Sequence, residues 1–293
     1  MKEVKDIKPR KKKSNSQMAV AVRQFKRNKL AMIGLFVFIV MILVCIFAEV
    51  ISPYDYAKVD PLNRFAPLGA AHPLGTDNLG RDILSRLLKG GQISLLVGTC
   101  SVLLSASVGA FLGCTAAYFG GWYETLVMRI MDILMSMPAL LMATAIATAL
   151  GTGILNSIIA ISVASLASIT RMMYSTALTV RGQEYLRAAR ANGASKLRCI
   201  FKYVLPNCLA PLIIQACMRF GTAITQIASL SFLGLGVLPP TPEWGSILNA
   251  GKQFIREYAP IVVFPGVFIA ITMACINFIG DGLRDAFDPR LKR

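Results

Sequence analysis

The sequence predicts an all-α protein that crosses a membrane six times. Apolar residues make up 55 % of the 293 residues and charged residues only 16 %, whereas soluble domains average about 25 % charged residues. Six mostly apolar stretches approach or exceed the length of about 20 residues that a helix needs to cross a bilayer. This composition excludes an ordinary soluble protein and a disordered chain, and it leaves too little polar sequence for a soluble domain on a single anchor.

The six predicted spans account for most of the chain. The first starts too late and is too long to be a cleaved signal peptide, and no A-x-A cleavage site follows it. Gly151-Thr152-Gly153 is the turn signal between the third and fourth spans, and the fifth is long enough to tilt or break. The predicted spans are residues 30–51, 93–118, 130–150, 154–170, 208–236 and 259–280.

The segments between the spans carry the charge. The chain has 31 Lys and Arg against 15 Asp and Glu, a net charge of +16. Most of the basic residues lie in residues 1–29, 171–207 and 281–293, and the loops 52–92 and 237–258 hold fewer. Basic residues favour the cytoplasmic side of a membrane. We therefore expect both termini in the cytoplasm and the other two loops outside, and we interpret the basic N-terminal segment as a membrane-surface feature rather than a nucleic-acid arm.

Residues suited to catalysis or metal binding are scarce. His72 is the single histidine, so neither a catalytic zinc site nor a serine-type triad is favoured. The chain has no G-x-x-x-x-G-K-[ST] loop for nucleotide phosphates. Arg219 is the one charge well inside a span, and two interpretations stay open: a residue on a transport pathway, or a residue that pairs helices or reaches to the membrane surface.

Several local patterns predict contacts near the spans. From Thr76 onward the outer loop indicates a short amphipathic helix, which Thr76 or Asp77 would cap, with Asp77/Arg81 and Asp82/Arg86 as pairs four residues apart. Arg129 and Asp132 have the spacing of an ion pair on one helix face. Small residues recur every four positions in the second span and predict close packing against another helix: Ser105, Gly109, Gly113 and Ala117.

The sizeable inner loop between spans is predicted over residues 171–207, and its informative part is residues 184–207. Its first part, Glu184–Ala191, favours a helix, and Asn192-Gly193 is a natural stop. A second helical stretch is expected to end near Pro206. The alanines would leave a surface against which another protein can pack closely, although the loop could also do no more than return the chain to the membrane.

Four long stretches in order carry a resemblance. They are HPLGTDNLGRDILSRL (72–87), EYLRAARANGASKLRCIFKYVLPN (184–207), LSFLGLGVLPPTPEWGSIL (230–248) and NFIGDGLRDAFDPRL (277–291). After about residue 16 the chain resembles the inner-membrane permease subunit of binding-protein-dependent ABC importers, of the second-permease type in the dipeptide/oligopeptide (peptide/nickel) family. The resemblance implies the type I ABC importer permease fold, with residues 93–280 as the permease core.

The inner loop resembles the EAA motif of that family, which implies coupling helices that dock in a groove of an ATPase subunit. Arg187 stands where the general motif has Glu, and Tyr203 where it has Ile. The peptide subgroup shows this variant, with Glu184 three residues before Arg187. The ATPase-coupling residues implied by the resemblance are Glu184, Arg187, Ala188, Ala189, Gly193, Leu205 and Pro206.

The resemblance also implies partners and a place in the cell. The chain would be a non-catalytic half of a pore in the bacterial plasma (inner) membrane. It would work with a second homologous permease, two ATP-binding subunits that use ATP and Mg, and an extracytoplasmic substrate-binding protein, and it would bind no cofactor itself. Di- or oligopeptides are the expected substrate. The alternatives are nickel or another small solute such as glutathione, a self-sufficient secondary transporter, which would need repeats and coupling residues, and a membrane enzyme.

Overall fold

The computed structural model describes residues 17–287, with side chains from residue 21 onward, and within that part it is helical and has no strand. The all-α class is confirmed. Parts of the basic segments that we expect in the cytoplasm, residues 1–16 and 288–293, lie outside the described residues. In chain order the helices are α1 (Gln17–Arg27), α2 (Lys29–Ile46), α3 (Ala48–Ile51), α4 (Ile83–Phe119), α5 (Gly121–Met135), α6 (Ala139–Leu150), α7 (Ile154–Arg181), α8 (Glu184–Ala191), α9 (Lys196–Cys199), α10 (Leu205–Phe232), α11 (Trp244–Gly251) and α12 (Pro260–Phe287), with short turns at Pro61–Asn63, Ile200–Val204 and Lys252–Phe254.

Five of the described helical segments are long and apolar enough to cross a membrane, and a sixth is reached only if α5 and α6 are counted as one bent span. The span predicted over residues 130–150 is divided between α5 and α6, which meet at 93°. Pro138 lies in the break. Proline disfavours helical backbone at the residue before it and cannot donate a backbone hydrogen bond.

The other helices also differ from the predicted spans at their ends. The helix predicted over 93–118 begins at Ile83, and the one predicted over 154–170 continues to Arg181. α10 ends at Phe232, although the fifth span was predicted to reach residue 236. The hydrophobic pattern locates the apolar part of a helix, and α4 and α7 extend beyond it into polar sequence.

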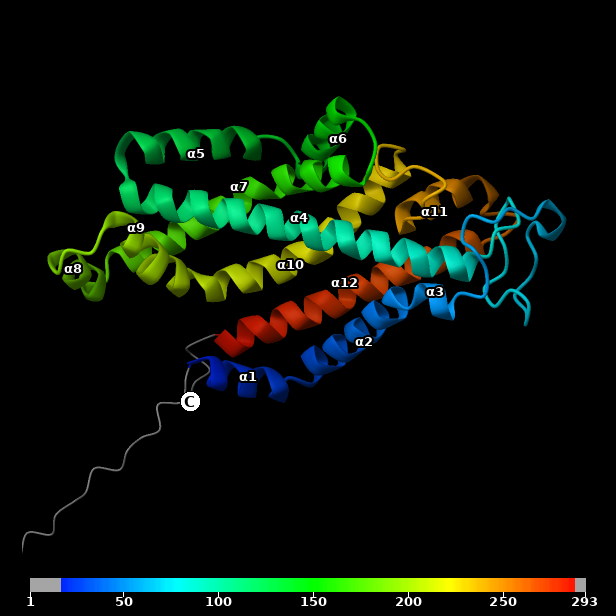
Figure 1. The fold of residues 1–293 in the computed structure, drawn as a ribbon, viewed down its shortest axis with the longest axis horizontal. Helices are drawn as coiled ribbons and strands as arrows, with labels where there is room; N and C mark the ends of the chain where they lie inside the picture. Colours follow the sequence, from blue (N-terminus) through cyan, green and yellow to red (C-terminus); the bar gives the residue numbers. More distant parts are fainter. Residues whose placement is uncertain (1–16, 288–293) are drawn as a thin grey trace, which may run out of the picture.

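The centre of the bundle is the pair α4 and α7. The small-residue face predicted on α4 lies against α7: a Cβ atom at Gly109 would lie 2.9 Å from Ile169, and one at Gly113 would lie 2.8 Å from Met173 Cβ. The prediction of close packing is confirmed. α10 and α12 continue the bundle, and α2 packs along α12 (Figure 1).

The loops separate to the two ends of the bundle (Figure 1). One end, called here the α8 end, carries α8 and α9, and the C-terminal part of α12 and α1 lie toward it. The opposite end, called the α11 end, carries the loop 52–82 and α11. The segments that the sequence assigns to the same side of a membrane therefore lie toward the same end of the molecule.

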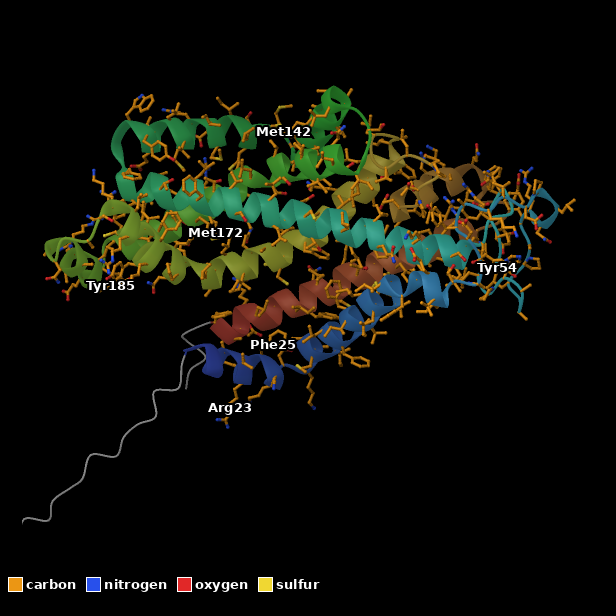
Figure 2. All side chains as sticks on the ribbon, viewed as in Figure 1. Arg23, Phe25, Tyr54, Met142, Met172 and Tyr185 are labelled. Carbon is orange, nitrogen blue, oxygen red and sulfur yellow. The ribbon has the colours of Figure 1, made fainter. Side chains whose placement is uncertain are left out.

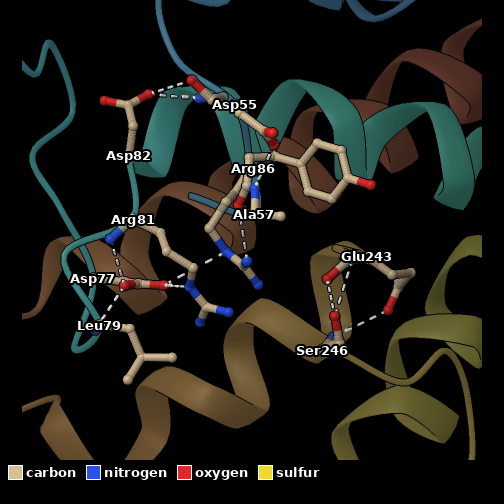
Figure 3. Close-up of polar contacts among 11 residues, drawn as sticks. Asp55, Ala57, Asp77, Leu79, Arg81, Asp82, Arg86, Glu243 and Ser246 are labelled. Carbon is tan, nitrogen blue, oxygen red and sulfur yellow. Dashed lines mark hydrogen bonds and ion pairs between the residues drawn. The ribbon is translucent and has the colours of Figure 1, made fainter. Parts of the chain in front are cut away.

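The loop before α4 differs from its prediction. No helix begins at Thr76. Instead Asp82 caps α4, its carboxylate accepting a hydrogen bond of 2.8 Å from the backbone of Ser85. Asp77 and Arg81 do form an ion pair of 2.7 Å, but in a turn. The predicted Asp82/Arg86 pair is wrong, since Arg86 lies 3.5 Å from Asp77 (Figure 3). These four charged residues are buried, so they hold the loop in one conformation.

The second outer loop is fixed against the start of α4. Glu243 is fully buried and accepts a hydrogen bond of 2.8 Å from the Ser94 hydroxyl. Glu243 and Ser246 also cap α11 reciprocally, as Figure 3 shows. The indole of Trp244 donates to the carbonyl of Leu87 at 3.0 Å. These bonds join two segments that are about 150 residues apart in the sequence.

Polar contacts also hold α5 against α7. The spacing predicted that Asp132 would pair with Arg129. Asp132 instead forms its ion pair with Arg171 on α7. Nearer the α8 end, Tyr174 donates a hydrogen bond to Glu124. Both contacts cross between helices, so they position the bent pair on the bundle.

Candidate functional site

The helix α8 has the limits that the sequence predicts. It begins at Glu184, whose negative charge is favourable at a helix N-terminus, and it ends at Ala191. Asn192 follows, and Gly193 then adopts a φ of +78°, a backbone conformation that glycine adopts without steric cost. Ser195 caps the next helix by accepting from the backbone of Arg198 at 3.3 Å. The loop is therefore two helices joined by a glycine corner.

One side of α8 is anchored in the core of the bundle. Leu186 has no exposed surface and belongs to a hydrophobic cluster with residues of α4, α7 and the segment before α10. Cys199 is equally buried in the same cluster. A displacement of α8 must therefore move, or separate from, the ends of the helices that form this cluster.

Cation–π contacts tie the same loop to the end of α4. The Arg190 guanidinium lies 4.6 Å from the centre of the Tyr118 ring, and the Lys196 ammonium lies 6.0 Å from that of Phe119. Arg181 donates a hydrogen bond of 2.8 Å to the carbonyl of Ala117. Sequence reasoning missed these residues. Their signal is a pair of aromatic residues at the end of a span followed by basic residues in a loop.

The other side of α8 faces outward. Tyr185 is 43 % exposed on this side. Ala189 is half-buried, and the neighbouring predicted residues are exposed: Glu184, Arg187, Ala188 and Gly193. Five of the predicted coupling residues thus lie on α8 and its corner, where they form a surface with small side chains at its middle.

Leu205 and Pro206 lie apart from α8, at the start of α10. The prediction that the second helical stretch ends near Pro206 is wrong, because the helix runs on through the π-helical turn Ile200–Val204 into α10. Pro206 occupies the first turn of α10, where a backbone N–H is not needed. The coupling surface and the transmembrane helix are therefore joined without a flexible loop after Ser195.

α10 carries a polar stripe that sequence analysis did not identify beyond Arg219. Its members recur at intervals of four and three residues, so they lie on one face of the helix. Thr222 is exposed and the others are half-buried. The buried Oε1 atom of Gln226 has no hydrogen-bond partner within residues 17–287. The spacing could have revealed the stripe from the sequence: Gln215, Arg219, Thr222, Gln226 and Ser229.

A hollow lies at each end of this polar stripe. Gln215 lines one of about 590 Å³ between α10, α7 and the end of α12, together with Met172 and Arg284. Ser229 lines another of about 400 Å³ toward the α11 end, with Leu140 of α6 and Leu248 of α11. Each end of the stripe therefore borders a hollow.

Two family models match the chain, one at its N-terminal end and one over its C-terminal part. Residues 109–293 match the model of the binding-protein-dependent transport system inner membrane component. Residues 16–67 match the N-terminal transmembrane domain of oligopeptide transport permease C. Together the two matches include α8, its glycine corner and the polar stripe of α10.

Named relatives cover nearly the whole chain. It is 43 % identical to the dipeptide transport system permease protein DppC of Alkalihalophilus pseudofirmus, over 93 % of this chain and 90 % of that protein. The di/tripeptide permease DppC of Pseudomonas aeruginosa is 42 % identical over 92 % and 91 % of the two chains. The glutathione permease GsiD of Escherichia coli is 42 % identical over 92 % and 89 %.

A solved structure supports the fold. The chain resembles the inward-facing MetNI methionine ABC transporter with a TM-score of 0.55 and 21 % identity, over 69 % of this chain and 96 % of that one. The likeness confirms the ABC permease fold predicted from the sequence. With the family match over more than half of its length, the chain belongs to the inner membrane components of binding-protein-dependent transport systems.

Proposed function

We propose that this chain is one of two permease subunits of an ATP-driven importer and that it forms half of the pathway for dipeptides or short oligopeptides. The observation that carries the proposal is α8, which exposes a small-residue surface while Leu186 anchors it in the bundle core. A helix built in this way can receive motion from a second protein and transmit it to α4, α7 and α10. Catalysis of ATP hydrolysis, with ATP and Mg, belongs to separate subunits.

The polar stripe of α10 is the pathway half that this proposal requires. Arg219 and the uncharged polar groups beside it offer a cation and amide or hydroxyl partners to a peptide backbone and its carboxylate. A single chain leaves this stripe open on one side, so a second homologous permease closes the pathway by facing it. An extracytoplasmic binding protein delivers the substrate at the α11 end, and both termini lie in the cytoplasm of a bacterial cell.

The substrate class rests on the relatives. Two of them are named for dipeptides or di- and tripeptides. Glutathione, itself a tripeptide derivative, is the second candidate, because a permease named for it is 42 % identical to this chain. Dipeptides and glutathione share a free carboxylate and amide groups, which the same stripe would accommodate.

Replacement of Ala189 by Trp tests the coupling role. Added bulk at a half-buried small residue costs about 1–3 kcal/mol, so Ala189→Trp should reduce co-purification of the ATPase subunits or uncouple hydrolysis from uptake. The complex is reconstituted in vesicles with its partners, and uptake of a labelled dipeptide and of glutathione is measured together with ATP hydrolysis. Leu197→Trp, at a 61 % exposed position in the same loop, is the matched control. Full docking, hydrolysis and uptake in Ala189→Trp would exclude α8 as the coupling element.

A further inference from the structure

A third cavity lies away from both the coupling surface and the polar stripe. It has a volume of about 360 Å³ and is bounded by α1, α2, α10 and α12. Its lining is apolar, with Phe25, Met32, Ile213 and Leu283 among its residues, and Lys26 is the charged residue among the described residues that line it. We call this cavity the α1 groove. An apolar channel with a cation at its edge has the chemical pattern of a binding site for an amphiphile with a negative head.

The α1 groove exists because the turn between α1 and α2 is fixed on α12. Asn28 caps α2 by accepting a hydrogen bond of 3.1 Å from the backbone of Ala31, and its amide donates to Asp285 at 3.3 Å. Gly282 has no side chain where Ala31 and Phe25 approach. The groove is therefore built from well-packed neighbours. Asp285 on α12 thus bonds the turn through Asn28 and forms no ion pair with a basic residue of α1 within residues 17–287.

The described basic residues around this turn are not neutralised by acids. Arg23, Lys26, Arg27 and Lys29 are exposed, and no acidic side chain within residues 17–287 forms an ion pair with any of them. Figure 2 shows Arg23 directed away from the bundle and Phe25 on the side toward α12. α1 thus has the apolar and basic faces of a helix that lies at a membrane surface.

We propose that the α1 groove binds an anionic phospholipid, with an acyl chain between α1, α2 and α12 and the phosphate beside Lys26. The groove lies where the apolar helix α2 begins and α12 ends, next to the basic residues of α1, which is the level at which a lipid has its headgroup. Because its lining is apolar, we expect the groove not to bind inorganic phosphate. The α1 groove contains no residue of the polar stripe. Lipid binding there can therefore be tested independently of the proposed transport function.

Binding of lipid to the full-length chain in detergent tests this proposal. Phosphatidylglycerol and phosphatidylcholine with identical acyl chains are the probes, and bound lipid is measured by native mass spectrometry. We expect preference for phosphatidylglycerol. A basic residue near an anionic lipid surface contributes about fivefold in affinity, so Lys26→Gln should weaken phosphatidylglycerol binding by about that factor, while Lys26→Arg should not. Lys58→Gln, with the same charge change on an exposed residue of the loop 52–82, should leave binding unchanged.

A groove variant separates the acyl chain from the headgroup. Val22 lines the groove and is 50 % exposed, so Val22→Trp can obstruct it without disturbing the core, and it should weaken binding of both lipids. The proposal is overturned by equal binding of the two lipids, by equal effects of Lys26→Gln and Lys58→Gln, or by displacement of phosphatidylglycerol by inorganic phosphate. It is also overturned if lipid binds only after residues 288–293 are deleted, since the chain's own tail would then be the occupant.

Discussion

Arg219 is the residue at which the membrane and the proposed pathway make opposing demands. A charge in the centre of a bilayer costs about 2.5–3.5 kcal/mol, and within residues 17–287 no acid pairs with this one. Its place on the polar stripe, between Gln215 and Thr222, accounts for that cost if the stripe faces water and substrate. The two interpretations left open by the sequence therefore differ in what a neutral replacement would do.

Arg219→Met should lower dipeptide uptake while the complex still assembles and hydrolyses ATP, because the stripe loses the cation that attracts a carboxylate. Arg219→Lys should retain most of the uptake, since the charge is kept. Uptake in vesicles and yield of the assembled complex are measured side by side. A loss of assembly with Arg219→Met would instead assign the residue to helix pairing, and unchanged uptake with unchanged assembly would exclude both roles.

Gly193 offers a residue-scale test of the corner after α8. Its φ is +78°, and no atom lies within 4 Å of the position that a Cβ would take, so a side chain there would be strained by the backbone alone. A left-handed conformation costs most residues about 1–2 kcal/mol, and a β-branched side chain more. We expect Gly193→Val to weaken ATPase docking and Gly193→Asn, which tolerates this conformation, to retain it. Equal docking by the two variants would show that the corner does not constrain α8.

At the scale of elements, the anchoring of α8 depends on Leu186. Truncating a fully buried leucine costs about 2–5 kcal/mol, whereas truncating an exposed one changes stability by about 0.5 kcal/mol or less. Leu186→Ala should therefore loosen α8 and reduce the uptake obtained per ATP hydrolysed, while Leu197→Ala should behave as the unmodified chain. Proteolysis of the 184–195 segment and the ratio of uptake to hydrolysis are the measurements. Equal protease resistance in the two variants would contradict the anchor.

Elements with local signals could be predicted from the sequence, and those decided by distant contacts could not. The limits of α8 follow from its alanines and from Asn192-Gly193, which are neighbours in the chain. The start of α4 does not, because Thr76 and Asp82 are both suitable caps. The Thr76 hydroxyl instead bonds the carbonyl of Asn63, which leaves Asp82 to begin the helix. The angle of 93° between α5 and α6 at Pro138 could not be predicted, since a hydrophobic pattern does not report the angle at which two helices meet.

The candidate sites also contain some features that local sequence signals predict and others that depend on distant contacts. The residues of α8 were available from their resemblance to a motif, and the polar stripe of α10 was available from its spacing. Which face of α10 stays open depends on how α6, α7 and α12 pack around it, and the sequence does not specify this. The aromatic and basic residues gave a signal in the sequence, but the pairing of Arg190 with Tyr118 joins residues that are far apart in the chain, and a local pattern does not specify it.

For the whole molecule, the two ends must lie on opposite sides of the membrane. The α8 end carries α8 and its basic neighbours, and most Lys and Arg of the chain belong to segments expected there. The α11 end carries the loop 52–82, in which Asp77 and Arg81 are paired and buried, whereas Lys58 and Arg64 are exposed. Basic residues favour the cytoplasmic side of membrane proteins, so we predict that the α8 end lies in the cytoplasm, where the proposed ATPase subunits would reach it.

Single cysteines in a background without the seven native ones test this orientation on intact cells. Asn63 is exposed at the α11 end and Ser195 at the α8 end, so neither replacement disturbs the core. Asn63→Cys should react with a membrane-impermeant thiol reagent on intact cells, and Ser195→Cys only after permeabilisation, because the membrane shields one end from the reagent. Labelling both variants after permeabilisation controls for accessibility. Reaction of Ser195→Cys alone on intact cells would reverse the orientation, and it would remove α8 from the compartment that holds ATP.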